Sequence, residues 1–120
     1  MITNVQWEKA RQWLQPALDR GGNTHTTDDI RAGIISGSFQ FWTSEKSAAI
    51  TEIVSYPCSK GCRVFLAGGD MTELLAMQPE LEAWAQSIGC KFIEIDGRPG
   101  WERIHKDFKK QSVVLRKALS

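Results

Sequence analysis

Residues 62–96 read CRVFLAGGDMTELLAMQPELEAWAQSIGCKFIEID, and the spacing of the apolar residues changes twice within them. Apolar side chains alternate over residues 62–67, which predicts a strand. They then recur about every 3.6 residues over residues 71–88, which predicts a long amphipathic helix that Pro79 kinks or divides into two. Residues 91–96 predict another strand. A strand, a helix and a strand of these lengths form a right-handed crossover with the two strands parallel.

Two further strands precede this crossover. Residues 38–43 and 47–56 also alternate with a period of about two, and the links at residues 44–46 and 57–61 are short and rich in turn-forming residues. Consecutive strands joined by such links are antiparallel neighbours. Residues 38–67 therefore predict a three-stranded meander.

Two amphipathic helices begin the chain. The first ends at the glycine pair 21–22, and Pro16 kinks or splits it. The second begins at the threonine pair 26–27, where a hydroxyl can cap the free amides, and it runs to about Ser36. The apolar residues on one side of the first helix are Trp7, Ala10, Leu14, Ala17 and Leu18.

After the crossover, residues 97–100 predict a tight turn, residues 101–108 a short helix and residues 112–118 a last strand. The complete order is ααβββαβαβ. This is an α/β (α+β) fold with a mixed sheet, in which an antiparallel meander joins a parallel βαβ unit. A chain of 120 residues buries roughly two-thirds of its unfolded surface, so we expect residues 1–120 to form a single domain.

Charge is nearly balanced overall but not along the chain. Lys plus Arg number 15 and Asp plus Glu number 14, so the net charge is +1. This balance removes the overall attraction to DNA or anionic lipid and argues against nucleic acid as a partner. Residues 1–102 carry 9 basic and 13 acidic side chains, whereas residues 103–120 carry 6 and 1. The C-terminal end is therefore basic enough to bind an anion.

The sequence predicts neither a membrane span nor a metal site. No run of about 18 apolar residues is present, and residues 1–8 lack the order of a signal peptide, so we expect a cytoplasmic protein with no membrane partner. Three cysteines without an export signal favour reduced thiols. Cys58 and Cys62 are too few for tetrahedral zinc, and we expect a turn between strands there.

Four stretches resemble one known family: WTSEKSAAITEI at 42–53, FLAGGD at 65–70, LEAWAQSIGCKFIEI at 81–95 and GRPGWER at 97–103. With the order of elements, they are similar to the GNAT superfamily of N-acetyltransferases, most of all to small GNAT-like proteins of tailed bacteriophages and prophages. The resemblance covers about residues 26–118. It implies a GNAT-like sheet, acetyl-CoA as cofactor and transfer of acetyl to an amine on a protein or small molecule in the bacterial host cell.

The family's cofactor loop corresponds to residues 66–69. The resemblance implies that Leu66, Ala67, Gly68 and Gly69 bind the cofactor, with its diphosphate on the free amides of the following helix. This sequence lacks the basic residue of the family's loop, and Asp70 and Glu73 have the spacing of a capping pair, which would occupy those amides and repel a diphosphate. Five basic residues follow the last strand of the crossover, and they either bind an anion in place of the loop or form a solvated basic face. They are Arg98, Arg103, Lys106, Lys109 and Lys110.

Acetyl transfer needs a base for the amine proton, and many family members add a tyrosine as the acid for the leaving thiolate. No tyrosine lies within residues 101–108. Glu52 is the first candidate base because it lies in mid-strand among apolar residues, where burial raises a carboxyl pKa. His105 is the second. The alternatives are a paired, partly exposed strand residue for Glu52 and an exposed helix residue for His105.

Three further residues lie where a substrate or partner can be met. Trp42 and Trp101 flank turns, where aromatic side chains line a cleft or plug a sheet edge. Arg98 lies in the turn after a parallel strand, where ligands bind in such sheets.

Two functions remain open at this stage. One is an N-acetyltransferase, and the other is a catalytically degenerate, virion-associated protein that binds a phage or host protein, because a fold does not fix a function. An exposed edge of the meander is also compatible with a homo-oligomer.

Overall fold

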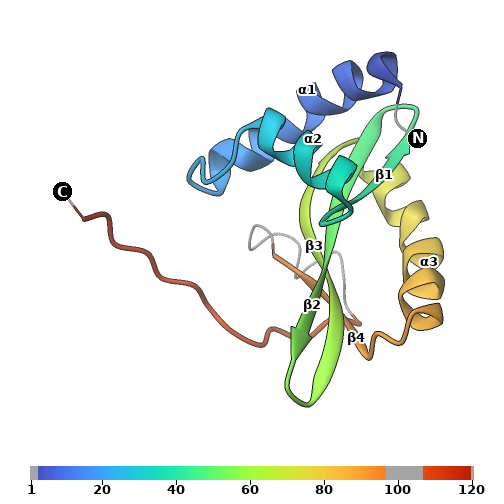
Figure 1. Cartoon of the computed structure of the whole chain (residues 1–120), viewed down its shortest axis with the longest axis vertical. Helices are drawn as coiled ribbons and strands as arrows, with labels where there is room; N and C mark the ends of the chain where they lie inside the picture. Colours follow the sequence, from blue (N-terminus) through green and yellow to red (C-terminus); the bar gives the residue numbers. More distant parts are fainter. Residues whose placement is uncertain (1–2, 97–106, 120) are drawn as a thin grey trace.

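The computed structural model describes residues 3–96 and 107–119. Its elements in chain order are α1 (Asn4–Arg20), α2 (Thr27–Ser36), β1 (Gln40–Ser44), β2 (Ser47–Tyr56), β3 (Ser59–Gly69), α3 (Met71–Ser87) and β4 (Phe92–Ile95). Figure 1 shows α1 and α2 on one side of the sheet and α3 on the other. The helices and strands that the sequence predicts up to residue 96 are therefore confirmed.

The four strands form one mixed sheet in the order β1-β2-β3-β4. β1, β2 and β3 are antiparallel neighbours, and β3 pairs with β4 in parallel. The α/β character, the meander and the parallel crossover are thus confirmed. Residues 61–64 of β3 pair with β4, and β3 then continues beyond this pairing to Gly69.

Local capping fixes where α1 and α2 begin. Thr3 accepts a hydrogen bond from the amide of Gln6, whose side chain accepts one from Thr3 in return. Thr26 and Asp29 form the same reciprocal pair at the start of α2. At the N-terminus of each of these two helices, two free backbone amides thus gain a hydrogen-bond partner. These bonds also hold the pKa of Asp29 below its usual value, because the hydrogen bonds from Thr26 favour the ionised carboxylate.

Both prolines lie inside single helices. Pro16 falls in the last turns of α1, and Pro79 falls in the middle of α3. Of the two alternatives for each proline, a kink or a division, the division is therefore excluded. Leu14 and Leu18 pack against the sheet on either side of Pro16, and Leu81 and Ala85 pack beneath α3 after Pro79, which offsets the backbone hydrogen bond that each ring removes.

Two apolar clusters lie on the two faces of the sheet. The cluster beneath α1 and α2 consists of Trp7, Ala10, Leu14, Leu18, Ile30, Ala48, Ile50 and Leu66. The cluster beneath α3 consists of Cys62, Val64, Leu81, Ala85 and Cys90. Val64 and Leu66 lie two residues apart on β3 but belong to different clusters, because a register shift between Ile50 and Thr51 of β2 interrupts the alternation of side chains.

The expected strand at residues 112–118 is absent, which corrects the sequence prediction. Residues 108–119 have no regular secondary structure and run away from the sheet (Figure 1), with Arg116 donating a hydrogen bond of 2.9 Å to the carbonyl of Gly21. A strand needs a neighbouring edge for its backbone groups, and this segment joins no edge of the described sheet. The expected helix at 101–108 lies mostly outside the described residues; Asp107 is in a turn and Phe108 is not helical.

Among the described residues, no helix is both long enough and apolar enough to cross a membrane.

Candidate functional site

The residues expected to hold a cofactor, Leu66 to Gly69, form the last part of β3. They pair with β2, from Ile50 opposite Leu66 to Ser47 opposite Gly69. Leu66 is buried in the cluster beneath α1, whereas Ala67 faces α3. On the β4 side, these four residues lie beyond the part of β3 that pairs with β4.

Close packing explains both glycines of this stretch. A Cβ on Gly68 would lie 1.9 Å from the carbonyl oxygen of Trp13, so the backbone of α1 rests directly on this residue. Gly69 has a φ of +105°, and a Cβ there would lie 2.2 Å from the carbonyl oxygen of Lys46. The space that the two glycines leave is therefore filled by this chain's own backbone.

The N-terminus of α3 is closed by its own carboxylates. Asp70 accepts a hydrogen bond of 3.1 Å from the amide of Glu73. The carboxylate of Glu73 does not return the bond but accepts two bonds of 2.8 Å, from the amide of Lys46 and from the hydroxyl of Ser47. Glu73 thus ties α3 to the turn between β1 and β2, and two negative charges lie where the positive end of the helix dipole would meet an anion.

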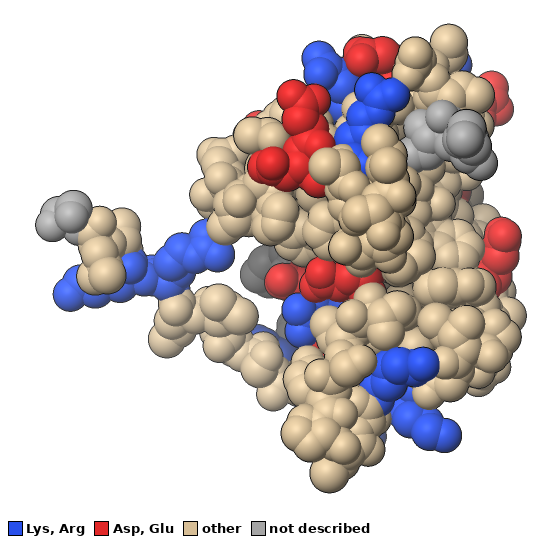
Figure 2. Space-filling model, viewed as in Figure 1, with Lys and Arg blue, Asp and Glu red and all other residues tan. Residues whose placement is uncertain are grey.

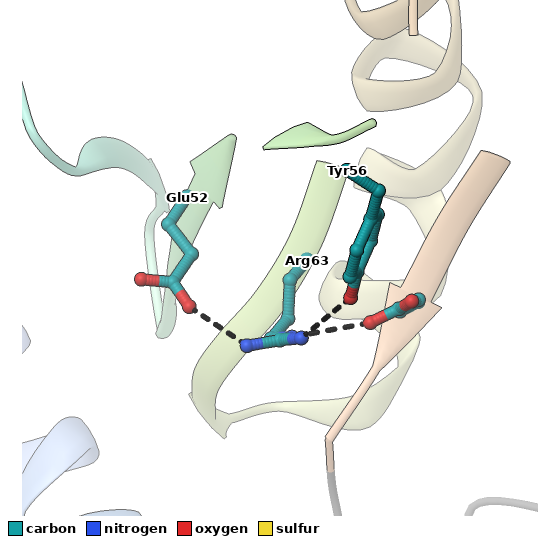
Figure 3. A network of polar contacts seen from close by, with 4 residues as sticks. Glu52, Tyr56 and Arg63 are labelled. Carbon is teal, nitrogen blue, oxygen red and sulfur yellow. Dashed lines mark hydrogen bonds and ion pairs between the residues drawn. The ribbon is translucent and has the colours of Figure 1, made fainter. Parts of the chain in front are cut away.

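A network of polar side chains crosses three strands on the sheet face opposite α3 (Figure 3). Arg63 on β3 donates to Glu52 on β2 at 3.3 Å and to Glu94 on β4 at 3.2 Å. It also donates to the hydroxyl of Tyr56 at 3.2 Å. Glu52 is opposite Arg63 in the β2–β3 register, and Arg63 is opposite Glu94 in the β3–β4 register, so the three charges form one row.

Charge pairing dominates this network. Burial alone would lower the pKa of Arg63, but the hydrogen bond and charge of Glu94 together with the charges of Tyr56 and Glu52 outweigh burial and raise the pKa above its usual value. The side chains of Glu52, Arg63 and Glu94 are each about one-third exposed, at 27%, 31% and 34%. Glu52 is therefore a paired, partly exposed strand residue.

Trp42 lies on the other face of the sheet, against α3. Its indole nitrogen donates to the hydroxyl of Thr51 at 3.0 Å, and its ring meets that of Trp84 edge to face at 5.5 Å. Because β1 is an edge strand, Trp42 covers the sheet edge, and it also lines a small cavity beneath α3. Trp42 and Glu52 point to opposite faces, so the structure does not bring these two predicted site residues together.

A small apolar cavity lies between the sheet and α3. Its volume is about 40 Å³, which accommodates a few methyl groups and is far too small for a coenzyme. The residues that line it are Trp42, Ala49, Val64, Ala67, Leu74, Met77, Gln78, Leu81, Ile93, Ile95 and Phe108.

The cysteines form no metal site in the part of the chain that the structure describes. Cys58 is exposed in the turn between β2 and β3, as expected, whereas Cys62 is buried beneath α3. Burial raises the pKa of the Cys62 thiol to about 11, which disfavours the thiolate that a metal needs. No group of three or more His, Cys, Asp or Glu side chains is arranged to hold a metal ion within residues 3–96 and 107–119.

The remaining predicted site residues, Arg98, Trp101 and His105, lie outside the described residues. The residues that the sequence prediction missed are Arg63, Glu94 and Tyr56. A signal for the first two was present, because each is a charged residue within an otherwise apolar strand, the same pattern that singled out Glu52.

Comparison of the chain with family models, with curated proteins and with solved structures found no match. The geometry of the described residues is therefore the basis for a function.

Proposed function

We propose that this chain is a GNAT-like protein of the phage type that has lost acetyl transfer and acts by binding a phage or host protein. The observation that carries this proposal is the closed N-terminus of α3. The helix end that would hold the cofactor diphosphate is occupied by Asp70 and by the contacts of Glu73.

Three physical effects oppose acetyl-CoA in the family's usual mode. The amide of Glu73 already has a partner, so a phosphate oxygen gains no new bond there. The carboxylates of Asp70 and Glu73 repel a diphosphate. The close contact of Gly68 with Trp13 removes the space through which a ligand would approach the backbone of this residue.

Acetyl transfer remains the second candidate, and one observation favours it. Glu52 lies on the sheet face opposite α3, where its carboxylate is partly exposed and reachable from solvent. With Arg63 released, it would be positioned to accept a proton from an amine on that face. A cofactor would then have to bind in another mode than on the amides of α3.

Titration with acetyl-CoA by calorimetry separates the two candidates. We expect no heat of binding up to about 1 mM ligand. The double variant Asp70→Ser, Glu73→Gln keeps a capping hydroxyl but removes both charges, and we expect its affinity to be at least about tenfold higher than that of the wild type. Glu80→Gln, at an exposed position further along the same helix, is the matched control and should change nothing.

A dissociation constant in the micromolar range for the wild type would contradict the proposal and favour the enzyme. In that case Glu52→Gln provides the next step. It should slow acetyl transfer to an amine while leaving the affinity for acetyl-CoA nearly unchanged, and equal turnover would exclude Glu52 as the base.

A further inference from the structure

The C-terminal segment, residues 107–119, exposes apolar side chains that its own chain does not cover. Leu115 is 89% exposed and Leu119 is 90% exposed, and Val113 and Val114 are also largely exposed. Large apolar side chains exposed to water are unfavourable in proportion to their exposed area. Such a surface indicates an interaction site.

The pattern of this segment is that of a strand. Val113, Leu115, Lys117 and Leu119 fall on one side of an extended chain, and the residues at 114, 116 and 118 fall on the other. The β-branched and apolar residues at 113–115 favour extended pairing. The segment therefore needs the edge of a sheet rather than a groove for a helix.

The sheet offers such an edge at β4. Among the described strands, β4 has a neighbour on one side only, since the order of strands ends with it. An edge strand presents unpaired backbone groups that another strand can join. Lys91 precedes β4, Glu94 within it is paired with Arg63, and the exposed Asp96 follows it, so the negative charge of this edge lies toward its Asp96 end.

The positive charge of the segment suits the Asp96 end of this edge. The segment carries Lys109, Lys110, Arg116 and Lys117 against one acidic residue, Asp107. Figure 2 shows basic side chains along the segment that projects from the body, and both acidic and basic side chains in the hollow beside it. Complementary charges of this kind bring two surfaces together and fix their register.

Independently of the function proposed above, we propose that residues 112–118 of one copy add as a strand to β4 of a second copy. Within one chain, the bond between Arg116 and the carbonyl of Gly21 carries the segment toward the loop between α1 and α2. Because every copy has both the segment and the edge, two copies can exchange their segments reciprocally and form a closed dimer.

The first test is the mass of the full chain in solution by light scattering after gel filtration. We expect twice the 13.5 kDa of one chain at concentrations of tens of micromolar. Val113→Asp and Leu115→Asp each place a charge in the apolar row, and each should raise the dissociation constant of the dimer at least about tenfold. Val5→Asp is the matched control, an exposed apolar residue on α1 whose substitution should leave the dimer intact.

Amide hydrogen exchange at two protein concentrations distinguishes a second copy from the same chain. In the exchanged dimer, the amides of residues 112–118 are protected at high concentration and become exposed on dilution. Protection that does not depend on concentration would place the strand on its own chain and overturn the proposal. A wild type that stays monomeric, or a dimer that survives Leu115→Asp, would overturn it as well.

Discussion

The two faces of the sheet are packed to different degrees. Beneath α1 and α2, eight residues form one buried cluster, and the backbone of α1 touches the sheet at Gly68. Beneath α3, five residues are buried and a cavity of about 40 Å³ remains. We call these the α1 face and the α3 face.

The difference shows which part of the molecule tolerates change. On the α1 face, every added atom meets a neighbour, because protein interiors are packed as densely as crystals. On the α3 face, an added methyl group can enter existing space. The α1 face therefore sets the position of the helix and sheet, whereas the α3 face leaves room for side chains to vary.

Gly68→Ala should produce the largest effect, because it breaks the closest contact of the α1 face. The new Cβ would lie 1.9 Å from the carbonyl oxygen of Trp13, and neither backbone can yield without moving α1. We expect a loss of about 3 kcal/mol in the free energy of unfolding, measured by urea denaturation.

Gly37→Ala is the control for this substitution. Gly37 has a φ of +87°, but a Cβ added there would have no neighbour within 4 Å, so only backbone strain of about 1 kcal/mol is expected. Equal losses for the two variants would show that the contact between α1 and Gly68 does not limit packing.

Ala48→Val and Ala49→Val compare the two faces at neighbouring positions of β2. Ala48 is fully buried in the cluster of the α1 face, whereas Ala49 lines the cavity of the α3 face. Because both sites lie in the same strand, the strand preference of valine affects both equally. We expect Ala48→Val to destabilise the protein by about 1–3 kcal/mol and Ala49→Val to change its stability by less than about 0.5 kcal/mol.

Thermal unfolding followed by circular dichroism is sufficient to measure this pair. If Ala49→Val lowers the stability as much as Ala48→Val does, the cavity cannot accommodate the added methyl groups. The proposed contrast between the faces would then be wrong.

The fold up to residue 96 could be predicted because local signals agree with one another. The change in apolar spacing, the short turns and the caps all point to the same elements. Residues 112–118 show the limit of this reasoning. Alternation reports that a segment is suited to a strand, but the pairing edge is a property of the tertiary or quaternary structure, which local sequence does not contain.

The candidate site was less predictable than the fold. Glu52 could be singled out as a charged residue in an apolar strand, but its pairing with Arg63 and Glu94 depends on the registers of two strand pairs. The resemblance implies a ligand at Gly68, and the structure shows that the backbone of Trp13, from a distant helix, approaches this glycine closely. Close backbone approach and ligand binding both require glycine, so sequence alone does not separate them.

The pH dependence of stability that arises from Cys62 is a small expected effect, and it measures how well the α3 face is buried. Burial raises the pKa of its thiol from 9.0 to about 11, so the folded state keeps the proton that the unfolded state loses. The stability that this thiol contributes is present below pH 9 and is lost as the pH rises toward 11. Between pH 8 and pH 10 we expect the free energy of unfolding to fall by about 1 kcal/mol more in the wild type than in Cys62→Ala.

Reaction with a thiol reagent at pH 8 tests the same burial by a separate measurement. Cys58 is exposed and should react at once. Cys62 should react at least about a hundredfold more slowly, because its raised pKa lowers the population of its reactive thiolate by about that factor. Cys58→Ser and Cys62→Ala assign the fast and slow phases. If Cys62 reacts as fast as Cys58 in the folded protein, the α3 face opens to solvent far more readily than its packing indicates. The cavity would then mark a mobile helix rather than a fixed space, because local opening exposes buried groups before global unfolding does.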